Sequence, residues 1–463
     1  MGACRCRQVS DNLANKLRGL VRMPDDAPRF IAKYALEAVP RYTSYPPATK
    51  FHGKVGLADW QRWMTQQDKN PALSIYVHIP FCKSMCWYCG CHTTIPNAHR
   101  RVEHYLAALD IDIRRRAESA PPDGRVCHIH FGGGSPDMLK PEEFRAVMQQ
   151  IRASFNVAPD AEIAVELDPR GLDSELCQAM AQTGVNRASL GVQDISHEVQ
   201  KLIHRIQPLE IVQAAADKLR AVGISAINMD MMYGLPAQSV ARVCETANAI
   251  AGMGADRVSV FGYAHVPWFK KHQRAIPEER LPGAAERFDQ MLAANHTLSE
   301  AGYERIGFDH FARPADPLAR AARDGSLRRN FQGYTTDPST ILIGLGASAI
   351  SECPQGYVQT EPNPVRYANA VTSNADMIVR GVGRSMAQQA VASRIANLLC
   401  QFETEVEPGD PVDLAKDMLA EALVRIDDGR ITLTEAGRPY VRNLAARIDP
   451  AFRSTTEQHS VAV

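Results

Sequence analysis

The stretch that decides the fold covers residues 73–91 and reads LSIYVHIPFCKSMCWYCGC. Its first part is apolar and rich in β-branched and aromatic residues, which predicts a buried strand over Leu73–Ile79. Its second part holds four of the chain's eleven cysteines, in the spacing C-x3-C-x2-C-x-C: Cys82, Cys86, Cys89 and Cys91. A strand that runs directly into so dense a cysteine loop predicts a metal site at its carboxyl end.

The cysteine spacing favours an iron–sulfur cluster. Cysteine thiolates are the usual ligands of such clusters, and three thiolates from one short loop leave the fourth iron of a cubane open to a small molecule. A structural zinc site normally uses two ligand pairs separated by a dozen or more residues, and no second C-x2-C or H-x3-H pair follows this loop. A long chain with an odd number of cysteines also disfavours a disulfide framework. Zinc and free thiols remain the alternatives.

Composition excludes several classes of protein. The chain has 463 residues, enough for two or three domains, with 45% hydrophobic and 22% charged residues, as in ordinary globular proteins. A formal net charge of zero gives no indication of binding to nucleic acid or to an anionic membrane. No apolar run is long enough for a membrane span, and the N-terminal region lacks the apolar core of a secretory signal. We therefore expect a cytoplasmic protein with no nucleic-acid partner and no membrane span.

Strand and helix patterns alternate about six times between residues 73 and 302, which predicts a parallel sheet with helices outside it. Six units favour an α/β fold with a partial (βα)6 barrel of the TIM type, and a doubly wound sheet is the alternative. We expect three parts: an N-terminal extension (1–55), the barrel domain (56–362) and a mostly α-helical C-terminal domain (363–463). The last part contains a strand–turn–strand pattern around Asp428-Gly429 and no basic face, which indicates a lid or packing unit.

The strand ends carry polar residues that parallel barrels place together at one face. The first strand ends in the cysteine loop, and the second in Gly132-Gly133-Gly134-Ser135. The later strands end in these residues: Glu166, Asp168, Arg170, Gln193, Asp230 and His265. Singly, a tight turn, a helix cap or an ion pair explains each of them. Together they predict a site that holds a polar small molecule against an open iron.

These features resemble a known superfamily and one family within it. A C-x3-C-x-aromatic-C loop after the first strand and a GGG turn after the second resemble the radical S-adenosylmethionine (SAM) superfamily. Further motifs resemble the oxygen-independent coproporphyrinogen III oxidase (coproporphyrinogen dehydrogenase) family: RYTSYP (41–46), YVHIPFC (76–82), GVQD (191–194), DMMYGLP (230–236), YAHVP (263–267) and RNFQGYTT (329–336). The resemblance extends from about Tyr42 to about Phe452.

The resemblance implies an oxidoreductase of porphyrin and haem biosynthesis. Its reaction is the anaerobic oxidative decarboxylation of two propionates of coproporphyrinogen III to vinyls, which gives protoporphyrinogen IX. The expected cofactors are one [4Fe–4S] cluster, bound by Cys82, Cys86 and Cys89, and two molecules of SAM, one of which yields the 5′-deoxyadenosyl radical that attacks the propionate. A low-potential electron donor such as flavodoxin or ferredoxin is implied as the protein partner, and we expect a monomer.

The resemblance also assigns contacts by position. The first SAM is expected to meet Tyr76, Gly133, Glu166 and Ile350. The second is expected to meet Tyr88, Gly134, Ser135, Gln193, Arg205, Asp230 and Ala264. Cys91 is expected not to bind the cluster and is a possible catalytic residue, with a buried inert thiol as the alternative. The chain departs from the family pattern at Ser135, where threonine is usual, at Trp87-Tyr88, and in the loop Trp268-Phe-Lys-Lys.

Two questions stay open at this level. The substrate bears four carboxylates, and the sequence does not choose among five candidate basic residues: Arg41, Arg170, Lys270, Lys271 and Arg329. The rival functions are a haem chaperone of the same superfamily, a degenerate iron or redox sensor, and a DNA-binding regulator. The C-x-C extension and the 41–46 segment disfavour the chaperone, the intact cysteines disfavour the sensor, and the absence of a basic face disfavours the regulator.

Overall fold

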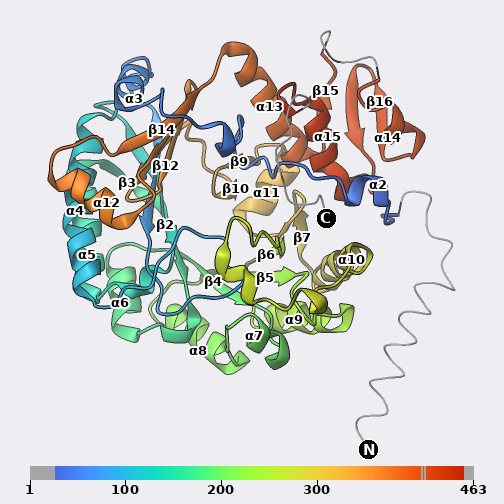
Figure 1. The fold of residues 1–463 in the computed structure, drawn as a ribbon, viewed down its shortest axis with the longest axis horizontal. Coiled ribbons are helices and arrows are strands. Elements are labelled where there is room, and N and C mark those ends of the chain that lie inside the picture. Colours follow the sequence, from blue (N-terminus) through green and yellow to red (C-terminus); the bar gives the residue numbers. More distant parts are fainter. Residues whose placement is uncertain (1–26, 408–409, 411–412, 453–463) are drawn as a thin grey trace, which may run out of the picture.

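The computed structural model describes residues 27–407, 410 and 413–452, so the first 26 residues of the expected N-terminal extension, Cys4 and Cys6 included, lie outside the described residues. A curved sheet forms the centre of the molecule, and helices cover its outer face (Figure 1). The buried side chains of the strands and helices form one main core between these two layers. No helix among the described residues has the length and apolar character that crossing a membrane requires.

Six neighbouring parallel strands confirm the predicted barrel. They are β1 (Ala72–Ile79), β2 (Arg125–Gly133), β3 (Asn156–Leu167), β4 (Arg187–Gln193), β5 (Ala226–Tyr233) and β6 (Arg257–Gly262). The helices that connect and follow them are α4 (Arg100–Glu118), α5 (Pro141–Ser154), α6 (Ser174–Gln182), α7 (His197–Leu202), α8 (Leu209–Ala221), α9 (Val240–Gly252) and α10 (Ala284–Glu300). Short 3₁₀ turns η2 (Pro136–Met138) and η3 (Pro169–Gly171) follow β2 and β3, and η4 (Lys271–Ala275) and η5 (Glu278–Arg280) follow β6.

Local sequence explains why α5 has the bounds that the pattern predicts. Pro141 occupies the first helical position, where its missing N–H costs no hydrogen bond and its fixed φ suits the helix. The carboxylate of Glu143 accepts a hydrogen bond of 2.8 Å from the backbone N–H of Lys140, which satisfies one donor just before the helix.

The sheet continues beyond the barrel on both sides, which the sequence pattern does not predict. Beside β1 it adds β11 (Ile341–Leu345, parallel) and then the antiparallel strands β12 (Ile350–Cys353), β13 (Gly356–Thr360) and β14 (Ile378–Gly383). Beside β6 it adds β8 (His310–Ala312) and β7 (Glu304–Ile306). Helix α11 (Pro317–Asp324) and the hairpin β9 (Arg328–Asn330) and β10 (Gly333–Thr335) connect the two additions. The six barrel strands are therefore the central part of an open sheet of twelve strands.

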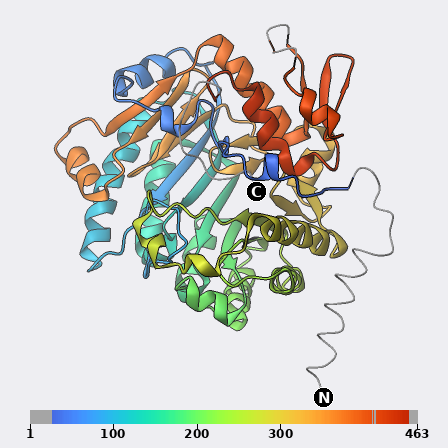
Figure 2. The same ribbon diagram turned by 45° about the vertical axis from the view of Figure 1, so that its right-hand side comes forward.

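Residues 27–55, here called the N-terminal strap, cross the molecule from the C-terminal helices to the far edge of the sheet. Tyr42 and Tyr45 donate hydrogen bonds of 3.2 and 3.1 Å to the carboxylate of Asp449, and His52 pairs with Gly381. The strap contains α2 (Ala32–Ala35) and η1 (Ala48–Lys50), and α3 (Leu57–Met64) follows it. Figure 2 shows the strap in blue against the red C-terminal helices.

The C-terminal part confirms the predicted hairpin at Asp428-Gly429. Its elements are α12 (Pro364–Thr372), α13 (Met386–Gln401), β15 (Glu403–Glu405), α14 (Lys416–Ala420), β16 (Val424–Asp427), β17 (Arg430–Leu433), η6 (Arg438–Tyr440) and α15 (Val441–Ile448). The division into 1–55, 56–362 and 363–463 remains a prediction. Because β14 pairs with β13 in the main sheet, we propose to draw the second boundary after Gly383.

Candidate active site

The cysteine loop leaves the carboxyl end of β1, and each of its first three sulfurs has a hydrogen-bond donor. Thr93 Oγ1 lies 3.1 Å from Cys82 Sγ. Arg205 Nη1 and Arg170 Nη2 lie 3.4 and 3.5 Å from Cys86 Sγ. The backbone N–H of Cys91 donates to Cys89 Sγ over 3.4 Å. Donors aimed at all three sulfurs suit thiolates.

The sulfurs also repel one another electrostatically. Burial raises the pKa of Cys82 to about 12, and the negative charges of Cys89 and Cys86 add to that effect. The pKa of Cys89 falls to about 6 because the Cys91 side chain and backbone amide donate to it. Thiolates gathered in a partly buried loop need a cation to compensate them, so this donor set fits an iron–sulfur cluster.

The backbone of the loop is held from the segment that follows β6. Lys270 Nζ donates to Cys91 O over 2.9 Å, the His272 ring lies 2.7 Å from Cys89 O, and Gln273 Nε2 donates to Tyr88 O over 3.0 Å. The atypical Trp268–Lys271 loop is therefore part of the scaffold of the cysteine loop. Sequence reasoning missed this role, since nothing in the segment itself points to contacts with residues 180 positions earlier.

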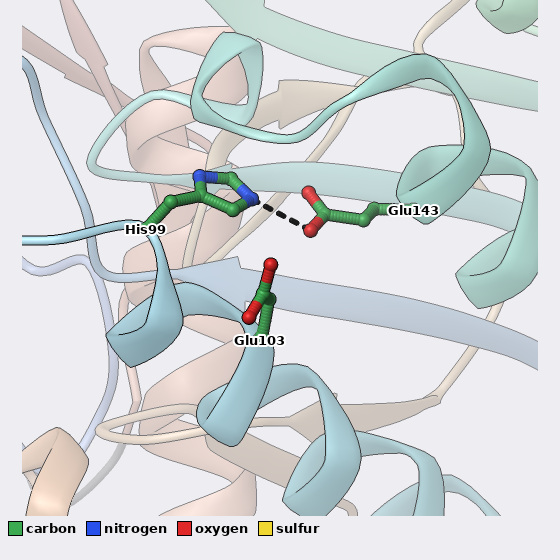
Figure 3. A group of neighbouring side chains, drawn as sticks. All are labelled: His99, Glu103 and Glu143. Carbon is green, nitrogen blue, oxygen red and sulfur yellow. Dashed lines mark hydrogen bonds and ion pairs between the residues drawn. The ribbon is translucent and has the colours of Figure 1, made fainter.

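Among the described residues, one group has ligand atoms close enough together for a single ion, and it contains no cysteine. It consists of His99, Glu103 and Glu143 (Figure 3). Structural contacts use all three: His99 Nε2 lies 2.6 Å from Glu143 Oε1, and Glu103 pairs with Lys140 at 3.5 Å. These contacts join the start of α4 to α5. The cysteine sulfurs are spread more widely, which disfavours a single zinc ion and suits a larger cluster.

The first group of predicted SAM residues comes together around Glu166 at the end of β3. Glu166 Oε1 lies 2.8 Å from His130 Nε2, and the N–H of Gly133 donates to Oε2 over 3.4 Å. The rings of Tyr76 and His130 stack with centroids 5.9 Å apart. Burial raises the pKa of Glu166, but the hydrogen bond and charge of His130 outweigh it, so the carboxyl stays below its ordinary pKa. The group presents an ionised carboxylate.

The glycine turn packs closely against the end of β1. A Cβ on Gly134 would lie 2.4 Å from the carbonyl oxygen of Phe81, and a Cβ on Gly133, which has φ +110°, would lie 2.4 Å from the His78 ring. The N–H of Ser135 donates to Phe81 O over 2.7 Å. The turn therefore fixes the end of β1 immediately before Cys82.

The second group of predicted residues centres on Arg205, which is only 6% exposed. Arg205 Nη1 lies 3.2 Å from Asp168 Oδ2, and Arg205 Nη2 donates to Gly191 O over 2.7 Å. The backbone N–H of Asp168 in turn donates to Ser135 Oγ over 3.0 Å. The Arg205 Nε is buried and has no hydrogen-bond partner among the described residues. A buried unpaired donor of this kind favours an anionic ligand nearby.

The other members of this group lie in the cysteine loop and on or just after β4, β5 and β6. Asp230 accepts hydrogen bonds from Asn228 Nδ2 (2.7 Å) and Ser189 Oγ (3.1 Å), and burial followed by the charge of Glu166 raises its pKa. Gln193 ends β4 with φ +66°. Tyr88 and Ala264 each accept a hydrogen bond from Gln273 through their carbonyl oxygens.

The side chain of Ile350 belongs to a small apolar cluster outside both groups. It packs with Phe51, Tyr357 and Val382. Only its backbone approaches the site: a Cβ on Gly344, which pairs with Tyr76, would lie 2.6 Å from Ile350 O.

Two histidines of the site were missed at the level of sequence. His130 pairs with Glu166, and His78 lies 3.0 Å from Tyr76 Oη and 2.9 Å from the carbonyl oxygen of His92. Burial lowers the pKa of His78 to about 4. Both residues occupy alternate positions near the ends of apolar strands, and that placement of a polar residue in a buried strand was the available signal.

The half-open barrel with a three-cysteine loop at the end of its first strand defines a radical SAM protein, and residues 76–250 match the Radical SAM superfamily model. Longer matches give the family. The chain is 42% identical to oxygen-independent coproporphyrinogen III oxidase of Bradyrhizobium diazoefficiens, over 93% of this chain and 98% of that protein. It is 37% identical to the Paracoccus denitrificans protein of the same name, over 92% and 96%. The solved structure of Escherichia coli coproporphyrinogen III oxidase, a radical SAM enzyme, superposes with a TM-score of 0.85 and 33% identity, over 90% of this chain and 100% of that chain. This chain belongs to the oxygen-independent coproporphyrinogen III oxidase family.

Proposed function

We propose that this protein converts two propionates of coproporphyrinogen III to vinyls without oxygen, giving protoporphyrinogen IX. The observation that carries the proposal is the trio of hydrogen-bonded thiols at the end of β1, in a chain that matches the family along nearly its whole length. Each propionate loses one hydrogen atom, one electron and CO₂, and a vinyl group remains.

The family uses a [4Fe–4S] cluster and SAM, and we propose Cys82, Cys86 and Cys89 as the cluster ligands. When bound, these cofactors supply the electron transfer and the 5′-deoxyadenosyl radical that removes hydrogen from the β-carbon of the propionate. The protein orients the two reactants and keeps water and oxygen away. Two features support the exclusion of water: Cys86 is buried, and the His272 ring contacts the carbonyl oxygen of Cys89, which leaves that part of the loop backbone covered.

We further propose two SAM molecules, with the contacts that the motifs predict. For the first, the ionised Glu166 suits an ammonium group, beside Tyr76 and the glycine turn. For the second, the unpaired Nε of Arg205 suits a carboxylate, and the buried Asp230 suits a ribose hydroxyl or an ammonium. Ile350 has the weakest support, since only its backbone approaches the site.

The electron donor, the oligomeric state and the compartment are also proposals. We expect a low-potential donor such as flavodoxin or ferredoxin, and Lys270 beside the cysteine loop offers positive charge for an acidic partner. The N-terminal strap and the C-terminal helices close the molecule within one chain, which supports a monomer. The reducing environment that free thiols require supports the cytoplasm.

An anaerobic assay tests the proposed function. The reconstituted protein is mixed with SAM, a low-potential reductant and coproporphyrinogen III, and the mass of the porphyrin is measured after oxidation. The loss of two carboxyl groups with vinyls in their place is the expected result, and Cys86→Ser is the inactive control. An unchanged porphyrin together with an intact cluster and SAM cleavage would favour the haem chaperone or a different substrate.

A further inference from the structure

Beside the end of β6, a cavity of about 290 Å³ is lined by arginines from four separate segments. Arg41 comes from the N-terminal strap, Arg287 from α10, Arg329 from β9 and Arg442 from α15. The cavity also reaches Ala264, one of the residues proposed to contact the second SAM. It therefore adjoins the site described above.

The positive charges of three of these arginines, Arg41, Arg287 and Arg329, have little compensation among the described residues. Asp309 is the one carboxylate among the described residues that line the cavity, and its Oδ1 lies 2.6 Å from His310 Nδ1. Among the described residues, Arg41, Arg287 and Arg329 form no ion pair, and they donate only to the carbonyl oxygens of Gly262, Tyr263 and Tyr42. The Nε atoms of Arg287 and Arg329 are buried without a hydrogen-bond partner.

The arginines also repel one another. Burial lowers the pKa of Arg287, and the charge of Arg41 lowers it further. The same two causes lower the pKa of Arg442 to about 10. All of these side chains stay protonated at neutral pH, so the folded protein holds a concentration of positive charge that a bound anion would relieve.

We propose that this arginine cavity binds the propionate carboxylates of the tetrapyrrole that are not reacting. The inference rests on the proposed function and identifies its substrate subsite. Arginine pairs carboxylates in two-pronged geometry, and the half-exposed Trp268, which also lines the cavity, adds aromatic surface for a pyrrole ring.

The reacting carboxylate lies outside this cavity. That group must give up its charge when it leaves as CO₂, and a paired arginine would stabilise it against leaving. The structure also separates four of the five basic candidates. Arg170 pairs with Asp168 at 2.5 Å, and Lys270 donates to Cys91 O, so both belong to the cysteine loop, whereas Arg41 and Arg329 face the cavity.

The test measures porphyrin binding separately from turnover. Coproporphyrin III and its tetramethyl ester are titrated anaerobically against the reconstituted full chain with SAM, and Kd is read from porphyrin fluorescence. We expect Arg41→Gln and Arg287→Gln each to weaken binding of the acid by about tenfold to a hundredfold, Arg287→Lys to recover part of the loss, and the ester to bind poorly to every variant. Arg430→Gln, an exposed arginine on β17, is the matched control and keeps wild-type affinity.

Turnover assays then distinguish a failure of the proposed carboxylate subsite from a failure of the proposed enzymatic function. Cavity variants should raise KM for coproporphyrinogen III while SAM cleavage without substrate stays unchanged. The proposed role of the cavity is wrong if the wild type makes the product but the variants keep its Kd and KM, or if the ester binds as tightly as the acid. In either case the proposed enzymatic function is unaffected. If the wild type neither binds the porphyrin nor converts the substrate, the function itself fails. Arg41 lies on the strap and is exposed, so its variant remains informative if Arg287→Gln does not fold.

Discussion

The guanidinium of Arg205 donates to the sulfur of Cys86 over 3.4 Å. The same group lies 3.2 Å from the carboxylate of Asp168. A proposed cluster ligand thus accepts hydrogen bonds from Arg205 and Arg170, and both arginines pair with the one carboxylate of Asp168. In a medium of low effective dielectric, such charges act on the reduction of the cluster.

We predict opposite shifts in the cluster's reduction potential when either charge is removed. Arg205→Gln removes a positive charge and makes the potential more negative, whereas Asp168→Asn makes it more positive. Each shift is expected to be on the order of 60 mV, a tenfold change in a one-electron equilibrium. Spectroelectrochemistry without SAM measures it. Arg170→Gln removes the other side-chain donor to Cys86 and should shift the potential in the same direction as Arg205→Gln. Shifts of the same sign in all three variants would contradict the electrostatic explanation.

Iron content distinguishes the fourth cysteine from the first three. Serine at Cys82, Cys86 or Cys89 is expected to abolish most of the bound iron and sulfide, because each thiolate is a proposed ligand. Cys91→Ser is expected to retain them, since the backbone N–H of Cys91 makes the hydrogen bond to Cys89 Sγ and serine keeps it. Iron and sulfide analysis after reconstitution checks both outcomes. Iron loss in Cys91→Ser would make Cys91 a ligand.

The glycine turn predicts a clear contrast between two substitutions in the same site. In Gly134→Ala, the new Cβ would meet the backbone of Phe81 at 2.4 Å, which forces the end of β1 to move. We expect a loss of stability of about 1–3 kcal/mol together with weaker SAM binding, measured by thermal unfolding and equilibrium dialysis. Gly90→Ala has nothing within 4 Å of its Cβ and should behave as the wild type. Equal behaviour of the two variants would refute the packing argument.

A partly buried ion network around Glu162 on β3 predicts a pH-dependent stability. Glu162 Oε1 lies 3.0 Å from His128 Nε2 and 3.2 Å from Arg187 Nε. Burial raises the pKa of Glu162, but the hydrogen bond of His128 and the charges of Arg187 and His128 outweigh it and hold the pKa well below its ordinary value of 4.5. A carboxyl with a lowered pKa stabilises the fold above pH 4.5, and this stability is lost as the pH falls below 4.5.

Glu162→Gln should therefore lower the unfolding midpoint at pH 7, for a loss of about 1–3 kcal/mol, because the side chain is partly exposed. The difference from the wild type should shrink as the pH is lowered from 5 to 3, and scanning calorimetry across that range measures it. Glu304→Gln, which breaks the exposed pair with Arg323, is the control and should change the midpoint little. A difference that stays constant with pH would show that the charge of Glu162 is unimportant.

The barrel was predictable because each of its elements carries its own local signal. The strands β1 to β6 are short apolar runs, and helices such as α5 have a proline start or a glycine end. The additional strands were not predictable in the same way. Ile341–Leu345 lies beside β1, with Leu73 opposite Ile341, and no local pattern reveals a pairing across more than 260 residues.

The candidate site shows the same division. Residues at strand ends, such as Glu166 and Asp230, could be placed together because the topology of a parallel barrel brings strand ends to one face. The arginine cavity could not be found this way. Arg287 and Arg442 lie on helices, and in the sequence each resembles an ordinary surface residue. Only the tertiary packing of α10 and α15 brings them to the same cavity.

The N-terminal strap ties together the two ends of the chain, and this has a consequence for the order of events on the ribosome. The cysteine loop and the six parallel strands are complete once residue 262 has been synthesised. The arginine cavity is complete only after Arg442 has been synthesised. The N-terminal strap can be held in place only after Asp449 has left the ribosome and can accept the hydrogen bonds of Tyr42 and Tyr45. A nascent chain can thus carry all three proposed cluster ligands on folded strands before it is able to hold its substrate, so cluster loading can precede the closing of the molecule.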